Sequence, residues 1–275
     1  MSELMGDKVA QHVPKQKILE EDFGWSIPVE AVPVPSSGIL YDPNSTLYKR
    51  ETLKIKAMTA HEEDILTSPA LLKEGSAIDY VIKSCLIDKS IDVGDLLVGD
   101  KNALMISIRI TGYGNQYNIV PKCENCEKTN QIGFNLSDLG INRLNIKPVE
   151  EGKNLFEYDL PVTKKKVYFK FLSVKEQKEK DKKEEIFERR ITDGVKKSVT
   201  NYLESVIVSI DNITDKNKIQ HFIRNMPAYD SKSLRQYMND NEPGIDMTHE
   251  WECKYCQHHN KNSLAVTSEF FWPRI

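Results

Sequence analysis

The sequence predicts an α+β fold in which two diverged halves, each made of strands followed by helices, meet at a zinc ribbon split between them. The same order of local signals occurs twice: a proline-bearing extended segment, a strand, a helix-capping motif, helices, a strand, a C-x-x-C pair and a final strand. Four of the five cysteines stand in those two pairs. We expect a flexible N-terminal arm over 1–24, a first half over 25–140 and a second half over 141–275.

The first half begins with residues 28–38, whose three prolines and terminal Ser-Ser-Gly favour an extended chain. This segment is either a surface linker or a strand that docks on the second half or on another protein. Residues 53–58 alternate apolar and polar side chains, as a strand with one buried face does. Thr59 and Glu62 then form a capping box, in which each side chain satisfies the other's backbone N–H, and a helix should follow to about Leu66.

Two more helices complete the first half, one from Ser76 and one from about Asp100 to the turn at residues 111–114. The glycines of that turn are typical of a helix C-terminus. After the first C-x-x-C pair, residues 135–155 show no regular pattern.

The second half repeats this order. Residues 167–172 read as a strand, and Ser173 with Glu176 forms a second capping box. The helix that follows carries opposite charges at helical spacing, which is typical of a solvated face. A helical apolar face comes next, and further helices should lie near 214–225 and 230–239 before Gly244 opens a strand. The residues of that apolar face are Val199, Tyr202, Leu203, Val206 and Ile207.

The two C-x-x-C pairs are Cys123 with Cys126 and Cys253 with Cys256. Each spacing lets one tight turn aim two sulfur atoms at one point, so two facing turns supply the four thiolates of a tetrahedral structural zinc site. The alternatives are two separate or partial sites, or no metal. His249, His258 and His259 stand close enough in sequence to replace a ligand. Cys85 lies in an apolar helical context and should be a packed core thiol.

Other uses of the cysteine pairs fit less well. No signal peptide is apparent, so we expect reduced thiols and not disulfides. A thioredoxin-like redox pair would stand between a strand and a helix, whereas both pairs here are followed by strands.

Composition bounds the function. The chain has 275 residues, 29% of them charged, and a net charge of -3, whereas nucleic-acid-binding proteins usually carry a basic excess. No apolar run is long enough to span a membrane.

No glycine-rich phosphate loop, H-E-x-x-H or nucleophile elbow is present, and a four-thiolate zinc ion has no open position for water. We therefore expect that the protein is not an enzyme. The alternative functions are a zinc-ribbon nucleic-acid-binding module and an enzyme whose site the sequence does not reveal. Against that module, lysines near the pairs are matched by glutamates: Lys122, Lys128, Lys254 and Lys261 against Glu124, Glu127, Glu250 and Glu252.

Several segments together resemble a phage family. Residues 32–41, 58–68, 95–104, 109–114 and 270–273 look like the corresponding stretches of the T4-type bacteriophage baseplate hub proteins and hub assembly factors. The resemblance implies a structural or assembly role in the hub of a contractile tail, with other hub proteins as partners and no catalytic site. It also implies a protein present in the host cytoplasm during assembly that either stays in the virion or leaves.

The aromatic run near the C-terminus, Phe270, Phe271 and Trp272, allows two interpretations. It is either a tail folded onto the protein's own core or an exposed anchor for a partner.

Overall fold

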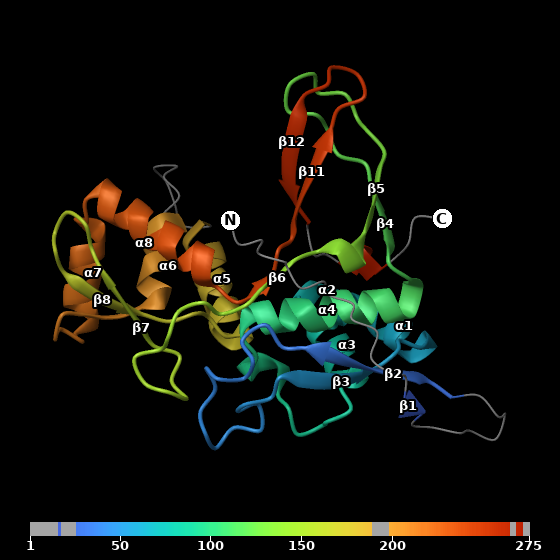
Figure 1. Cartoon of the computed structure of the whole chain (residues 1–275), viewed down its shortest axis with the longest axis horizontal. Coiled ribbons are helices and arrows are strands. Elements are labelled where there is room, and N and C mark those ends of the chain that lie inside the picture. The colour runs from blue at the N-terminus through green and yellow to red at the C-terminus, as the bar shows by residue number, and fades with distance from the viewer. Residues whose placement is uncertain (1–15, 18–25, 189–197, 265–267, 272–275) are drawn as a thin grey trace, which may run out of the picture.

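The computed structural model describes residues 16–17, 26–188, 198–264 and 268–271 (Figure 1). In the first half, strand β2 (Pro28–Pro33) pairs antiparallel with β3 (Thr52–Lys56), and β1 (Gln16–Lys17) adds to the other edge of β2. The extended segment is therefore a strand within its own half. The linker interpretation is wrong, because residues 28–33 pair along their length with β3. Docking as a strand on the second half is also wrong, since both partner strands, β3 and β1, precede the second half. Docking on another protein stays a prediction. The rest of the arm over 1–24 lies outside the described residues.

The helices of the first half are α1 (Ala60–Thr67), α2 (Pro69–Glu74), α3 (Ala77–Cys85) and α4 (Val98–Tyr113), with a 3-10 turn, η1 (Val93–Asp95), before α4. Sequence reasoning missed α2, a short helix with proline at its first position, and placed the start of α4 two residues late. The turn expected at residues 111–114 begins too early, because α4 continues to Tyr113; Gly114, where φ is +82°, is its C-cap.

The second half has a three-stranded antiparallel sheet, in the order β7 (Phe156–Asp159), β8 (Lys166–Phe169) and β9 (Ile207–Ile210). Its helices are α5 (Val174–Glu188), α6 (Ser198–Val206), α7 (Lys216–Arg224) and α8 (Ala228–Asn241). The sequence placed Ile207 on the helical face, which is wrong: helix α6 ends at Val206, and Ile207 pairs with Phe169 as the first residue of β9. Pairing with β8 overrides the helical spacing here.

Two hairpins project side by side from the body and meet at their tips (Figure 1). One consists of β4 (Gln116–Ile119) and β5 (Ile132–Asn135), and the other of β11 (Thr248–Glu252) and β12 (His259–Ser263). The stretch 135–155, expected to be irregular, contains the 3-10 turn η2 (Leu136–Asp138) and strand β6 (Ile141–Asn142), which pairs with β10 (Gly244–Ile245). The last element is a 3-10 turn, η3 (Ser268–Phe271).

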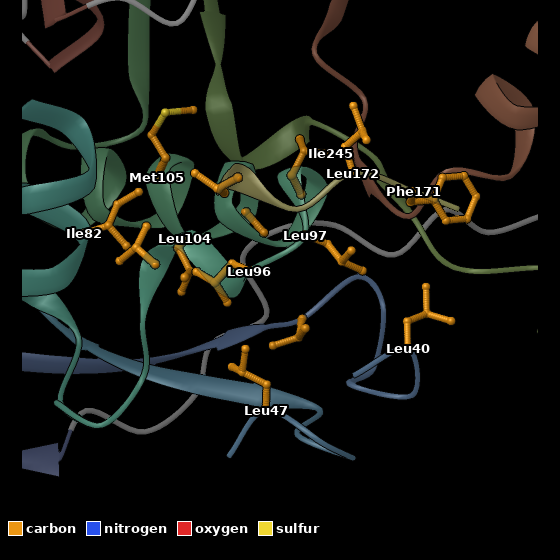
Figure 2. Packing of buried hydrophobic residues seen from close by; sticks show 14 of the residues in the cluster. Leu40, Leu47, Ile82, Leu96, Leu97, Leu104, Met105, Phe171, Leu172 and Ile245 are labelled. Carbon is orange, nitrogen blue, oxygen red and sulfur yellow. The ribbon is translucent and has the colours of Figure 1, made fainter. Parts of the chain in front are cut away.

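One continuous hydrophobic core runs through both halves. Figure 2 shows part of it, where Leu97 of the first half lies in the same core as Leu172 and Ile245 of the second. Phe270 and Phe271 are fully buried in this core, which confirms the folded-tail interpretation for these two residues. Trp272 lies outside the described residues.

None of the described helices combines the length and the apolar character that a membrane span requires.

The two halves repeat particular contacts as well as the order of elements. Each capping box is present, and in each the capping glutamate also accepts from a lysine six residues earlier: Lys56 bonds Glu62, and Lys170 bonds Glu176. Lys56 is the last residue of β3, and Lys170 directly follows β8. Each of these strands also pairs with the chain that follows the next helices, through Ile55 with Leu86 and through β8 with β9.

A second repeated contact joins the last helix of each half to a turn. Asp100, the third residue of α4, accepts from the backbone N–H and hydroxyl of Ser36 and from the Tyr41 hydroxyl. Asp230, the third residue of α8, accepts from the backbone N–H groups of Val162 and Thr163 and from the Thr163 hydroxyl. Asp100 precedes Cys123 by the same 23 residues by which Asp230 precedes Cys253. The third residue of each helix therefore makes the same kind of contact at the same sequence distance from the cysteine pair of its half.

The halves are also joined away from the hairpins. The backbone N–H of Val98 donates to Leu172, and that of Val174 donates to Leu96. Next to this bridge, α4 passes so close to the chain after α8 that a Cβ added at Gly99 would lie 1.8 Å from the Pro243 carbonyl oxygen.

We expect Gly99→Ala to destabilise the protein by about 2–3 kcal/mol, because two backbone segments must move apart to admit one methyl group. Urea unfolding of the full chain measures this. Gly140→Ala is the matched control, since a Cβ there meets nothing nearer than Asp246 at 4.0 Å. Equal midpoints for the two variants would contradict the close approach of the halves.

Stability should also depend on the buried Glu62. Burial opposes its ionisation, but hydrogen bonds from Lys56, Ser84 and Thr59 prevail and lower its pKa from 4.5 to about 2. Because the folded-state pKa lies below the unfolded one, the stabilisation is present above pH 4.5 and is lost as the pH falls toward 2. We expect about 2 kcal/mol to be lost between pH 7 and pH 3 from this group.

Urea unfolding at several pH values, with Glu62→Gln beside wild type, measures that contribution. The variant should be less stable at pH 7 but should show a shallower fall between pH 5 and pH 3. Glu150→Gln, which alters an exposed ion pair with Lys153, should keep the wild-type slope. An unchanged slope in Glu62→Gln would disprove the assignment.

Candidate metal centre

The four cysteines predicted to converge do so at the tips of the two hairpins. Their sulfur atoms all lie within 4.8 Å of one another. Two close pairs cross between the hairpins, with 3.7 Å from Cys123 Sγ to Cys256 Sγ and 3.6 Å from Cys126 Sγ to Cys253 Sγ. A tetrahedral ion with metal–sulfur bonds of about 2.3 Å separates its sulfur atoms by about 3.8 Å. The arrangement fits one four-thiolate metal site shared by the two hairpins.

The two turns that carry the cysteines have the same backbone. In the first, the N–H of Cys123 donates to Lys128, and the N–H of Glu127 donates back to Cys123. In the second, Cys253 donates to His258, and Gln257 donates back to Cys253. Glu127 and Gln257 have positive φ values of 58° and 57°. Each turn is thereby curled tightly enough to point both of its thiols inward.

The two turns also contact each other through a pair of buried asparagines, Asn130 and Asn260, which are 1% and 2% exposed. The Asn130 side chain donates to Cys253 Sγ at 3.5 Å and accepts from the backbone N–H of Lys254. The Asn260 side chain donates to Cys123 Sγ at 3.7 Å and accepts from the backbone N–H of Glu124.

Sequence reasoning missed these two residues although a signal was present. Both pairs belong to the longer pattern C-x-x-C-x-x-x-N, which ends at Asn130 and at Asn260.

The electrostatics of the four thiols favour a bound cation. Burial opposes ionisation of Cys253, but donors that include the backbone N–H of Tyr255 and the Asn130 side chain lower its pKa to about 6. At Cys126 the backbone N–H of Lys128 favours the thiolate, but burial and the neighbouring sulfur atoms outweigh it and raise the pKa to about 12. Closely spaced thiolates repel one another, and a cation bound between them would offset that repulsion.

The three histidines considered as substitute ligands are not part of this group of ligand atoms. His249 lies near the start of β11, away from the turn that carries the cysteines. Its ring stacks on Phe134 at 5.1 Å between centroids, and burial lowers its pKa. Cys85 is fully buried on α3, away from the other four cysteines, and burial raises its pKa to about 12. It is a packed core thiol, as expected.

The hairpins also contain a small apolar cluster. Trp251, on β11, packs with Cys123 and Cys253, and its indole N–H donates to Asn262 on β12. This cluster is separate from the main core, so the sulfur atoms themselves make up much of the interior of the paired tips.

Comparison with known proteins gives one finding. The model of a family described as T4 bacteriophage base plate protein matches residues 41–272, which is most of the chain and includes both cysteine pairs. Searches of curated proteins and of solved structures found no match.

Proposed function

Because the chain belongs to the T4 bacteriophage base plate protein family, we propose that it is a structural or assembly component of the baseplate hub of a contractile tail. In this proposal it binds other hub proteins, performs no turnover chemistry and uses one zinc ion as a structural cross-link. It is made in the host cytoplasm and either remains in the virion or leaves when the hub is complete. The family match carries the proposal, since it spans both halves.

The metal part of the proposal rests on the donor set. The ligand atoms that converge among the described residues are four cysteine sulfur atoms, a set that favours zinc or another soft cation, and a closed four-sulfur site is typical of structural zinc. Cys123, Cys126, Cys253 and Cys256 would hold the ion. It would supply a cross-link between sequence-distant hairpins and no catalytic chemistry.

The hub assignment is tested in infected cells. Phage that lack this protein should accumulate incomplete hubs and few finished tails, and an affinity-tagged copy should recover hub proteins from the lysate. Identification of the recovered proteins, and of this chain in purified tails, also separates a permanent component from an assembly factor. Normal tails from the deletion phage would refute the proposal.

A nucleic-acid-binding ribbon is the second candidate, and one observation favours it. Tyr255 is 51% exposed at a hairpin tip, with the ammonium groups of Lys128 and Lys254 at 4.8 Å and 5.1 Å from its ring centre. Exposed aromatic rings flanked by cations can stack on single-stranded bases. Filter binding of single-stranded DNA and RNA by the full chain at low salt distinguishes the candidates, since the hub proposal predicts no retention beyond that of a Tyr255→Ala variant.

A further inference from the structure

We propose that Asn130 and Asn260 are positioning residues, which lock the two cysteine turns together reciprocally and hold the four sulfur atoms at metal-binding distance before the metal arrives. This inference rests on the proposed structural metal site and goes beyond it, because it assigns the assembly of the site to two side chains that are not ligands.

The contacts are reciprocal in every detail. Each asparagine comes four residues after the second cysteine of its own turn, but its side chain reaches the opposite turn. There it meets the first cysteine with an N–H donor and the residue after that cysteine with its amide oxygen. Each amide also donates back to its own turn, Asn130 to the Lys128 carbonyl and Asn260 to the His258 carbonyl. One planar group therefore spans both turns on each side of the sulfur cluster.

This geometry connects the turns independently of metal. Two bonds from backbone N–H groups to amide oxygens, at 3.0 Å and 3.1 Å, need no ion. Both amides are almost fully buried, so water cannot easily replace these partners, and an unpaired donor there would be costly. A site assembled in advance loses less conformational entropy when it binds its ion, and the partners that orient metal ligands typically change metal affinity 10- to 100-fold when they are removed.

The experiment uses the full chain and the near-isosteric variants Asn130→Leu and Asn260→Leu. Asn262→Leu is the matched control, because Asn262 lies on the same hairpin as Asn260 but bonds Trp251 and not a sulfur atom. Amide hydrogen exchange on chelator-treated, metal-free protein measures whether the two asparagines hold the turns together without metal. In wild type, the N–H groups of Glu124 and Lys254 should both be protected.

Each variant should then lose protection on the opposite turn only: Asn130→Leu at Lys254, and Asn260→Leu at Glu124. A general loosening of the fold would lower the protection of both N–H groups in each variant. Zinc affinity, measured by competition with a chromophoric chelator, should fall about 10- to 100-fold and by similar factors in both variants, and should stay near wild type in Asn262→Leu. The positioning role would be refuted if the N–H groups of Glu124 and Lys254 were unprotected in metal-free wild type. It would also be refuted if both variants kept wild-type zinc affinity.

Failure of the metal proposal gives a different result. In that case wild-type protein takes up no zinc, but the N–H groups of Glu124 and Lys254 remain protected and respond to the variants as described. That result would refute the zinc site and support the positioning role of the two asparagines.

Discussion

Purified wild-type protein should contain one zinc ion per chain, and Cys253→Ser should contain none. Three thiolates from two turns no longer close the tetrahedron, and the loss should be felt in both hairpins because each contributes half of the ligands. Because a bound ion would close a loop of more than one hundred residues, the variant should lose about 3–5 kcal/mol of unfolding free energy. Metal analysis by mass spectrometry and urea unfolding measure the two effects.

Two controls sharpen this result. Cys123→Ser should behave like Cys253→Ser, because the two residues occupy equivalent places in the two turns. Cys85→Ser should lower stability by placing a hydroxyl in the core, but it should keep the full zinc content. Two ions per wild-type chain, or a Cys253→Ser protein with its metal retained, would refute a shared site.

Cys253→Ser should nevertheless leave a folded protein. The halves share one core, and they are also joined by the backbone bridge between Leu96 and Val174 and by the pairing of β6 with β10. A metal bound by the cysteines would therefore be one of several connections between the halves, unlike in a small zinc finger, where it is the main source of folding energy.

Asp100→Ala should be the most damaging single change outside the metal site, with a loss of about 3–5 kcal/mol. Asp100 is 1% exposed, and its removal leaves the buried backbone N–H and hydroxyl of Ser36 and the hydroxyl of Tyr41 without their acceptor. The Tyr41 hydroxyl also accepts from the backbone N–H of Leu97, so the start of α4 should loosen as well. Urea unfolding, with amide exchange at Leu97, measures both consequences.

Two comparisons test that explanation. Asp100→Asn keeps one acceptor oxygen in place, so it should cost less than the alanine variant. Asp230→Ala should also cost less, because its partners Val162 and Thr163 lie in a partly exposed turn where water can replace the carboxylate. If Asp230→Ala were as damaging as Asp100→Ala, burial of the donors would not be the deciding factor.

Local signals in the sequence were sufficient for much of the fold. Thr59 with Glu62 and Ser173 with Glu176 marked two helix starts, because a capping box is satisfied within four residues. Gly114 marked the end of α4, because its positive φ suits glycine. The spacing of the cysteines was sufficient to predict that Cys123, Cys126, Cys253 and Cys256 come together, since each turn supplies only half of a tetrahedral set.

Tertiary structure decided what depends on partners far away in the chain. Ile207 continues the helical spacing of α6 but is a strand residue, because β8 offers it a pairing edge. The prolines around residue 33 allow a linker or a strand equally well, and only the positions of β1 and β3 choose between them. Asn130 and Asn260 stood in a visible pattern, but their role arises from bonds to the opposite turn. Such bonds join residues more than one hundred positions apart, and no local propensity records them.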